Sequence, residues 1–457
     1  MIPVWAQLGY LLAAVCFVLA LKGLASPRTA RWGNLVGALG AAVAMGVVFG
    51  AGRPDNVVPI VAAMLVGAAA GIVAARRVVM TAMPQMVAVF NGLGGAAGAL
   101  VALLEVTGPN ADGPWYVRLA TAFTILVGSV AFTGSMLTFA KLQELMTGRP
   151  VVFPGLPWAF GLALAVTVLG GAWMVAAPGV APALVVAAVA LLIGVLLVLP
   201  VGGADVPIAI SLLNAFSGLT VAAGGYVLEN ALLLVAGTLV GASGTILTRL
   251  MAKAMGRSVV NILFGALRGG STLGADTVSV RPVRSAGPDD IAIQLGYARK
   301  VVVVPGYGLA VAQAQHTVHE LATLLESRGV EVSYAIHPVA GRMPGHMNVL
   351  LAEANVPYEQ LLEMAAANPE LHTADVALVV GANDVVNPAA RNVVGSPIYG
   401  MPILDVDRAQ GVVFLKRSMR PGFAGIENEL LYDPRTTLLF GDAKESLTKL
   451  VSAVQNL

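Results

Sequence analysis

Charged residues are scarce in this chain of 457 residues: aspartate, glutamate, lysine and arginine make up 11% of it, while hydrophobic residues make up 57%. A typical soluble domain carries about 25% charged residues, so an ordinary water-soluble protein is excluded. The formal net charge is only +2, which gives no support for a nucleic-acid partner. Together with a mean hydropathy of +0.81, this composition predicts that much of the chain lies in a lipid bilayer.

Cysteine is nearly absent as well. The single Cys16 lies in an apolar run, so an internal disulfide is excluded and we expect a packing role for it. No histidine precedes His316, and we predict no metal site. Residues 1–23 have neither a basic start nor a clear small-residue cleavage site, so we expect no cleaved signal peptide.

Long apolar runs dominate the chain before residue 250, and most carboxylates follow it. A helix needs roughly 20 apolar residues to cross the hydrocarbon core of a membrane. Candidate spans are residues 3–21, 33–51, 57–75, 83–104, 117–140, 158–176, 181–200, 206–228 and 230–250. The first part is therefore predicted to be a multi-pass α-helical bundle of about nine transmembrane helices.

Basic residues collect in alternate loops, after the odd-numbered spans. They are Lys22, Arg28, Arg31, Arg76, Arg77, Lys141, Arg149, Arg249, Lys253 and Arg257. The other loops hold little beyond Arg53 and Arg118. Because basic loops stay on the cytoplasmic side, we expect the N-terminus outside and everything after residue 250 in the cytoplasm. This orientation requires an odd number of spans and indicates the cell inner membrane.

Few polar residues interrupt these spans. Asn91 and Asn214 lie within predicted spans, Asp205 lies at the start of one, and hydroxyl residues such as Ser135 occur in the fifth. An unpaired polar group costs several kcal/mol in hydrocarbon, so each must face another helix or water. We expect the hydroxyls to bond to their own helix. A structural and a functional role remain equally open for both asparagines, and for Asp205 a helix cap is the alternative.

The second part of the chain alternates between strands and helices. We predict a linker at residues 263–290, after a membrane domain at 1–262, and an α/β domain at 291–457. Predicted strands lie near residues 301–304, 330–336, 376–380, 411–415 and 437–440. Predicted helices lie near residues 310–327, 357–367 and 443–455. This alternation is typical of a Rossmann-like parallel sheet covered on both faces.

A variant of the dinucleotide-binding fingerprint follows the first of these strands. It reads Gly306-Tyr-Gly308-Leu-Ala-Val311, with valine at the usual third glycine. The first glycine permits a tight turn, and the second lets the backbone approach a pyrophosphate. An ordinary glycine turn remains the alternative, but the position between a strand and a helix favours nucleotide binding.

The basic cluster Lys416-Arg417-Ser418 follows another strand, at the edge where ligands bind in such sheets. A point charge, a fork of donors and a hydroxyl suit a phosphate group. No acidic residue ends the strand near 330–336, where His337 follows directly. A carboxylate there would repel a 2′-phosphate, so the pattern favours NADP(H) over NAD(H). A basic strand end that is merely solvated remains the alternative.

At this point long segments of the chain resemble the beta subunit of proton-translocating NAD(P) transhydrogenases. The segments run from Pro305 to Gln315, Ile336 to Val349, Gly381 to Pro388, Lys416 to Met419, Gly441 to Lys444, Met83 to Asn91, Gly202 to Pro207 and Ser211 to Gly218. The resemblance covers essentially the whole chain. It implies hydride transfer from NADH to NADP⁺, coupled to proton movement across the membrane. It also implies the α/β domain as the NADP(H)-binding domain.

The same resemblance implies a set of site residues. Cofactor-binding positions are Gly306, Tyr307, Gly308, Ala310, Val311, Gly341, Arg342, Met343, Pro344, Gly381, Ala382, Asn383, Asp384, Lys416, Arg417, Ser418, Gly422, Phe423, Ala424, Gly425, Gly441, Asp442, Ala443 and Lys444. By the same resemblance, Asp384 couples protonation to nucleotide binding. The expected proton path includes Asn91, Asp205 and Asn214.

Two departures from the family pattern matter. The family commonly has an intramembrane histidine where this chain has Asn91, and a tyrosine where it has Phe423. An asparagine side chain does not titrate at accessible pH, so Asn91 is not a protonated relay. A partner membrane subunit is then the candidate source of the titratable group.

A transhydrogenase binds two nucleotides, but the chain carries a single fingerprint. NAD(H) is therefore expected on a soluble alpha subunit, with a small membrane alpha subunit as a further partner and a dimer of the whole assembly. Direct transfer between two nicotinamides needs no protein nucleophile, so we predict no catalytic acid or base. The alternative function is a transporter or channel gated by a cytoplasmic NADP(H)-sensing domain, which would show no hydride exchange.

Overall fold

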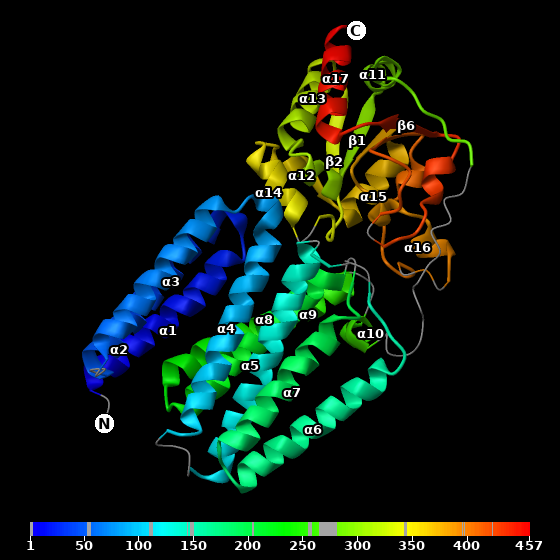
Figure 1. Ribbon diagram of the computed structural model, residues 1–457. Coiled ribbons are helices and arrows are strands. Elements are labelled where there is room, and N and C mark those ends of the chain that lie inside the picture. Colours follow the sequence, from blue (N-terminus) through cyan, green and yellow to red (C-terminus); the bar gives the residue numbers. More distant parts are fainter. Residues whose placement is uncertain are drawn as a thin grey trace. The chain divides into compact units, whose positions relative to one another are not determined.

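The computed structural model describes residues 3–52, 56–108, 113–143, 145–146, 150–202, 205–254, 258–264, 281–341, 345–394, 396, 398–422 and 424–457. These residues form two compact units. The larger part of the first unit is helical, and the second contains a six-stranded sheet. Figure 1 labels their helices and strands.

All nine predicted spans are confirmed as helices among the described residues. They are α1 (Val4–Leu24), α2 (Pro27–Gly52), α3 (Val57–Arg77), α4 (Met83–Glu105), α5 (Trp115–Leu142), α6 (Leu156–Ala176), α7 (Val180–Val198), α8 (Val206–Val227) and α9 (Ala231–Ala254). Each is long and apolar enough to cross a membrane. A short helix, α10 (Val259–Phe264), follows the ninth.

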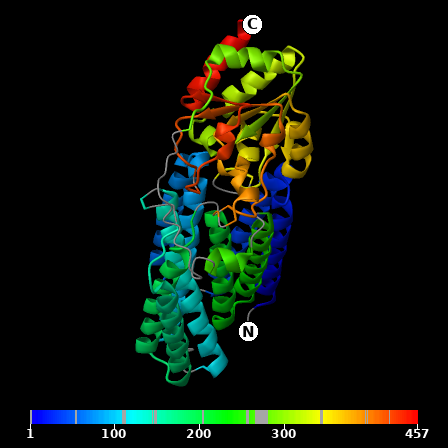
Figure 2. The same cartoon turned by 90° about the vertical axis from the view of Figure 1, so that its right-hand side faces the viewer.

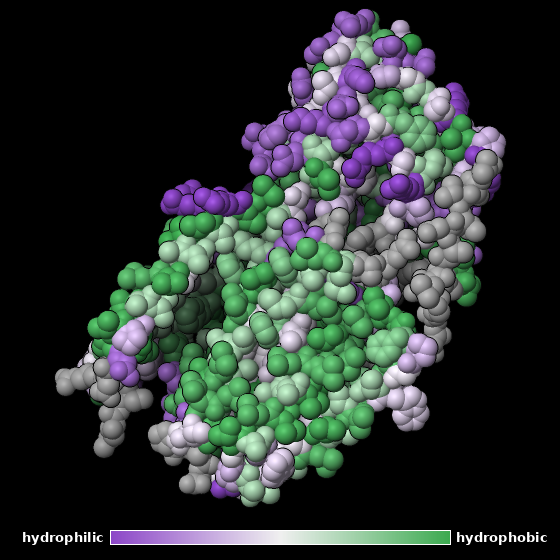
Figure 3. Space-filling view, in the orientation of Figure 1, coloured by the Kyte–Doolittle hydropathy of each residue, from purple (hydrophilic) through white to green (hydrophobic). Residues whose placement is uncertain are grey.

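The outer surface of the helical unit is apolar. Large hydrophobic side chains cover the face drawn in green in Figure 3, and Trp158 is 85% exposed. Monomeric soluble proteins rarely expose continuous apolar patches of this kind, whereas lipid-facing helices require them. The surface therefore agrees with a membrane-embedded bundle.

Glycines allow several of these helices to touch through their backbones. A Cβ on Gly218 of α8 would lie 2.4 Å from the backbone nitrogen of Gly241 in α9. A Cβ on Gly95 of α4 would lie 2.9 Å from the carbonyl oxygen of Gly128 in α5. In lipid, where burial of apolar surface between helices gains little, such close approach supplies the packing energy. The helices that carry Asn91 and Asn214 are thus held tightly by their neighbours.

The sheet of the second unit is entirely parallel, with strand order β3-β2-β1-β4-β5-β6. The strands are β1 (Lys300–Pro305), β2 (Glu331–Ile336), β3 (Leu361–Glu363), β4 (Val376–Val380), β5 (Gly411–Lys416) and β6 (Thr436–Phe440). The chain leaves β1 toward β2 and later returns to its other side with β4. In sheets of this order, a dinucleotide binds where the two directions diverge, beyond the carboxyl ends of β1 and β4.

Helices cover both faces of the sheet (Figure 1, Figure 2). On one face, α15 (Met364–Thr373) packs against β1 and β2 in a core that includes Val304, Leu371 and Phe414. On the other, α13 (Gln315–Ser327) and α17 (Ala443–Gln455) pack together, and α11 (Pro288–Gly296) packs on α17. Strands β1, β4 and β5 are buried along nearly their whole length, as expected for a sheet with two covered faces.

The five predicted strands are confirmed, but two details differ. The predicted helix near 357–367 contains the short edge strand β3, which has too few residues to show an alternating pattern. The predicted helix at 310–327 is two helices, α12 (Tyr307–Val311) and α13. They are separated at Gln313, whose φ of +49° cannot continue a right-handed helix.

Candidate functional site

Two glycine turns meet at the point where the strand order diverges. The backbone nitrogen of Gly306 donates to Val380 at 2.9 Å, and that of Gly308 donates to Gly381 at 2.9 Å. A Cβ on Gly306 would lie 2.3 Å from the Cα of Ala382, and Gly381 has a φ of +69°. Both turns therefore require glycine. Gly306 is buried, but Gly308 and Gly381 are partly exposed, so backbone without a side chain reaches the surface there, the property that a pyrophosphate-binding turn needs.

The loop after β4 carries Asp384 into contact with the loop after β5. One carboxylate oxygen of Asp384, Oδ2, accepts from the backbone nitrogen of Ala424 at 2.9 Å. Its Oδ1 accepts from the side chain of Asn383 at 3.3 Å. A Cβ on Gly422 would lie 2.5 Å from the same Oδ1, so this glycine permits the close approach. Asp384 thus lies beside Gly422 and Ala424, two further predicted cofactor-binding residues, and Gly425 follows with a φ of +73°.

A cationic group lies at the end of β5. Nζ of Lys416 donates to the carbonyl of Arg420 at 2.7 Å, while Arg417 and Ser418 are exposed. Burial lowers the pKa of Lys416, and the negative charge of Asp384 opposes that shift. A lysine held near a carboxylate and an exposed guanidinium make this edge suitable for a phosphate group.

The predicted segment from Gly441 to Lys444 lies next to this group. Gly441 donates its backbone nitrogen to the carbonyl of Lys416 at 3.1 Å. The side chain of Asp442 caps α17 by accepting from the backbone nitrogen of Lys444 at 2.9 Å. Ala443 is buried at the start of the helix, and Lys444 is exposed. The segment therefore lies at the same edge of the sheet as Lys416.

The segment after β2 is only partly described. Gly341 has a φ of +104°, and a Cβ there would lie 2.4 Å from the ring of His346, which begins α14 (His346–Glu353). Four predicted site residues lie outside the described residues: Arg342, Met343, Pro344 and Phe423. Of the fingerprint, Ala310 is buried and Val311 is exposed.

A family model for the NAD(P) transhydrogenase beta subunit matches residues 6–453. The NAD(P) transhydrogenase subunit beta of Rhodospirillum rubrum is 46% identical over 454 residues, covering 97% of this chain and 98% of that protein. A second protein of the same name, from a defined strain of that species, gives the same values. The chain belongs to the NAD(P) transhydrogenase beta subunit family.

Membership in this beta-subunit family decides several expectations. The chain is an integral membrane protein and part of an enzyme, NAD(P) transhydrogenase, which couples hydride transfer to proton translocation. The reaction uses NADP(H) and NAD(H), and a beta subunit works with an alpha partner. These findings favour the transhydrogenase over a gated transporter or channel.

Within the helical unit, Asn91 on α4 is buried and hydrogen-bonded to two neighbouring helices. Its Nδ2 donates to Oγ of Ser135 on α5 at 2.9 Å, and Ser217 on α8 donates to its backbone carbonyl at 3.4 Å. The expectation that the hydroxyls of the fifth span bond to their own helix is therefore wrong for Ser135. Its hydroxyl oxygen accepts from the Asn91 amide on α4, which cannot find a partner within its own helix. Asn214 is exposed on α8, and Asp205 directly precedes that helix. Sequence reasoning thus found Asn91 but missed its partner.

His337 is a second residue whose role the sequence did not reveal. The ring is buried, its Nε2 lies 2.8 Å from the carbonyl of Pro402, and its Nδ1 accepts from Val339 at 3.2 Å. These partners fix the neutral tautomer with the proton on Nε2. Burial lowers the pKa of His337 to about 4, and the bond to Pro402 opposes that shift only in part. The residue that follows β2, His337, therefore carries no charge near pH 7.

This burial makes the α/β unit sensitive to acid. The folded pKa of His337 is about 4, below the ordinary value, so the unfolded chain takes up the proton first as pH falls. Stability is then lost between about pH 6.5 and pH 4, by at most roughly 3 kcal/mol. We expect His337→Gln, which keeps a donor for Pro402 but does not titrate, to lose less. Unfolding temperatures measured for both chains at pH 7 and pH 4.5 check this; equal losses would contradict it.

Two buried asparagines join the loops after β4 and β5. Asn387 donates its Nδ2 to the carbonyl of Glu427 at 3.0 Å, and Asn428 donates its Nδ2 to the carbonyl of Asn383 at 3.1 Å. Asn387 could have been suspected from the sequence, because an asparagine before proline often begins a turn. No local signal marks Asn428, whose partner lies 45 residues away.

Proposed function

We propose that this chain holds NADP(H) across the carboxyl ends of β1 and β4, while a separate alpha subunit holds NAD(H). The observation that carries the proposal is the contact between Gly306 and Ala382, where backbone meets backbone with no room for a Cβ. In this double turn, the partly exposed glycines beside the contact, Gly308 and Gly381, leave backbone without side chains for a pyrophosphate to approach. Bound there, the nicotinamide of NADP⁺ would accept the hydride from NADH on the alpha subunit, and that of NADPH would return it in the reverse reaction.

We infer that the residues around this double turn contribute in three groups. The turn of Gly306, Tyr307, Gly308, Ala310 and Val311, with Gly381, Ala382 and Asn383, follows the pyrophosphate. Lys416, Arg417 and Ser418, with the segment from Gly441 to Lys444, hold the 2′-phosphate. The segments from Gly341 to Pro344 and from Gly422 to Gly425 enclose the rest of the nucleotide.

The preference for NADP(H) over NAD(H) rests on charge. The residue that follows β2 is the neutral His337, and burial keeps it uncharged near pH 7. An NAD(H)-specific site would place a carboxylate there to bind the ribose hydroxyl. The exposed guanidinium of Arg417 supplies positive charge instead, at the end of β5.

The assembly we propose contains the soluble NAD(H)-binding alpha subunit, a small membrane alpha subunit and a dimer of the whole. The single fingerprint at Gly306–Gly308 supports the first partner. Asn91 supports the second, because an amide bonded to Ser135 does not carry a proton, and a partner membrane chain is the candidate source of a titratable group at that position. Asp205 and Asn214 complete the proposed path on this chain. The loop charges support a cell inner membrane, with the α/β unit in the cytoplasm.

One assay tests the division of nucleotides between chains. The purified chain is loaded with NADPH and mixed with an NAD(H)-binding alpha subunit and an NAD analogue. Reduction of the analogue is expected only when both subunits are present. No exchange with any alpha partner, or exchange by this chain alone, would overturn the proposal.

Asp384 is the proposed coupling group, since its carboxylate lies between the nucleotide turns and the loop after β5. Protonation weakens its hold on the Ala424 nitrogen, and so links proton binding to nucleotide affinity. We expect Asp384→Asn to remove most of the pH dependence of NADP(H) affinity while keeping the side chain's shape. Binding titrations from pH 6 to pH 8 measure this. A full pH dependence in the variant would show that another group does the coupling.

A further inference from the structure

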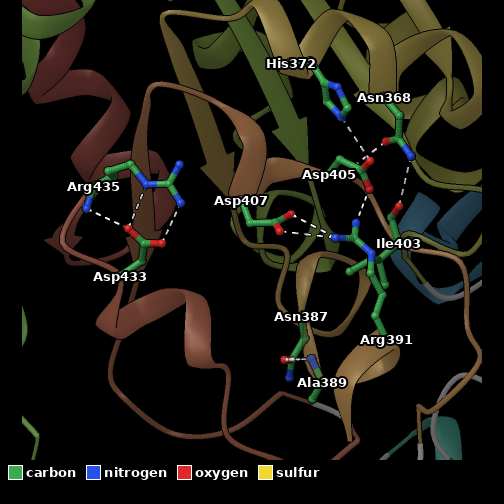
Figure 4. Close-up of polar contacts among 10 residues, drawn as sticks. All are labelled: Asn368, His372, Asn387, Ala389, Arg391, Ile403, Asp405, Asp407, Asp433 and Arg435. Carbon is green, nitrogen blue, oxygen red and sulfur yellow. Dashed lines mark hydrogen bonds and ion pairs between the residues drawn. The ribbon is translucent and has the colours of Figure 1, made fainter.

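Asn387 and Asn428 are almost completely buried, at 0% and 1% exposure. Each uses its amide oxygen locally: Oδ1 of Asn387 accepts from the nitrogen of Ala389 at 3.0 Å, and Oδ1 of Asn428 accepts from that of Leu430 at 3.0 Å. Figure 4 shows the first of these bonds. Each then uses its amide NH₂ to reach the other loop. Both side chains therefore have donors and acceptors satisfied in one arrangement.

The two long-range bonds are reciprocal. Asn387 belongs to the β4 loop (residues 381–388) and donates to the carbonyl of Glu427 in the β5 loop (residues 417–422 and 424–428). Asn428 belongs to the β5 loop and donates to the carbonyl of Asn383 in the β4 loop. The bond from Ala424 to Asp384 is a third link between the same loops. We call Asn387 and Asn428 the asparagine clasp.

We propose that the asparagine clasp is a positioning device that sets how fast NADP(H) leaves this chain. The inference rests on the proposed function, because both loops carry residues assigned there to the nucleotide site. The clasp contacts the assigned site at one residue, because Asn428 donates to the backbone carbonyl of Asn383. It acts by holding the β5 loop against the β4 loop, so that Ala424 stays on Asp384.

Burial gives the clasp its strength. A solvent-exposed bond between loops exchanges with water at little cost, but a buried donor that loses its partner is left unsatisfied. Separation of the loops breaks three bonds together: two from the buried amides and one to the charged carboxylate of Asp384. The β5 loop is consequently expected to open rarely, and nucleotide release that requires opening is slow.

Aspartate substitutions keep the size of each clasp side chain and remove its NH₂ donor. In Asn428→Asp and Asn387→Asp the remaining oxygen still accepts from Leu430 or Ala389, but the NH₂ donor to the other loop is lost. NADPH release is followed by fluorescence after rapid mixing of the NADPH-loaded full chain with excess NADP⁺. We expect each variant to release NADPH about tenfold faster, with little change in the association rate. Either variant alone suffices if the other does not fold.

Asn368, which is half-buried, provides a control outside the two loops. Its Nδ2 donates to the carbonyl of Ile403 at 3.3 Å, and its Oδ1 accepts from the nitrogen of Asp405 at 3.1 Å, so it links α15 to another segment in the same way (Figure 4). Asn368→Asp loses the same donor without touching the β5 loop. We expect its release rate to stay within about twofold of the unchanged chain, because distant sites act independently. If NADPH release became equally fast in this control, the effect would be a general loosening of the α/β unit, and the proposal would be overturned.

A measurement without nucleotide separates this proposal from the proposed function. Hydrogen–deuterium exchange of the peptide covering residues 424–431 is expected to quicken in both clasp variants of the nucleotide-free chain, and not in Asn368→Asp. If the unchanged chain does not bind NADPH, the proposed function fails, whatever the exchange shows. If NADPH binds but both clasp variants release it at the original rate, the clasp proposal fails and the proposed function stands.

Discussion

Gly306→Ala is expected to weaken NADP(H) binding by between about tenfold and 100-fold, since overpacking costs about 1–3 kcal/mol. The new Cβ would lie 2.3 Å from both the Cα and the nitrogen of Ala382. Both atoms belong to the backbone, so no side-chain rotation relieves the contact. The turns after β1 and β4 must move apart, and the pyrophosphate site widens. Titration of NADPH fluorescence against the purified chain measures the loss.

Gly287→Ala is the matched control for this prediction. Gly287 precedes α11 in an extended conformation, and a Cβ there would find only Asp290, at 4.0 Å. The same chemical change should therefore leave NADPH affinity unaltered. If Gly306→Ala binds NADPH as well as Gly287→Ala does, the double turn is not the pyrophosphate site.

Arg417→Gln should reduce NADPH affinity by about ten- to 100-fold, because a charge-assisted hydrogen bond contributes about 1.5–3 kcal/mol. Arg417 is exposed at the end of β5, where its guanidinium is available to a 2′-phosphate. NADH lacks that phosphate, so weak binding of NADH should not change. The ratio of NADPH affinity to NADH affinity is thus expected to fall, and only because NADPH binds more weakly. Competition titrations with both nucleotides measure it.

Arg420 offers a control of equal charge. It is exposed and lies near Lys416, but its part in the structure is a backbone carbonyl that accepts from the lysine. Arg420→Gln should therefore keep the preference for NADPH. Equal losses for the two arginines would indicate a general effect of positive charge, and equal losses of NADPH and NADH would place Arg417 away from the 2′-phosphate.

Local patterns made much of the fold predictable. The nine apolar runs and the five longer strands are confirmed because length, hydropathy and β-branched runs act within a single segment. The strand β3 was not predicted, because it has only three residues and lies at the edge of the sheet. The break between α12 and α13 was not predicted, because only the backbone conformation of Gln313 reveals it.

The candidate site divides in the same way. The glycine turn at Gly306 and the cluster at Lys416 are contiguous motifs, so the sequence predicts them directly. Asp384, Gly422 and Ala424 came from the family resemblance, and the structure places them in contact. No local pattern links them, because 40 residues separate Asp384 from Ala424.

Pairs formed by distant residues could not be predicted. His337 and Pro402 are 65 residues apart, and Asn387 lies 40 residues from Glu427. In the membrane bundle, Asn91 lies 44 residues from Ser135. Each pair satisfies a buried polar group, and which partner does so depends on how the elements pack. A single sequence shows the need for a partner but not its identity.

The central claim is that this chain holds NADP(H) and leaves NAD(H) to a partner. Equilibrium dialysis of the purified full-length chain against NADPH and NADH, with no other subunit present, tests it most directly. We expect saturable binding of a single NADPH per chain and no saturable binding of NADH. Saturable NADH binding of comparable affinity, or a chain that binds neither nucleotide, would contradict it.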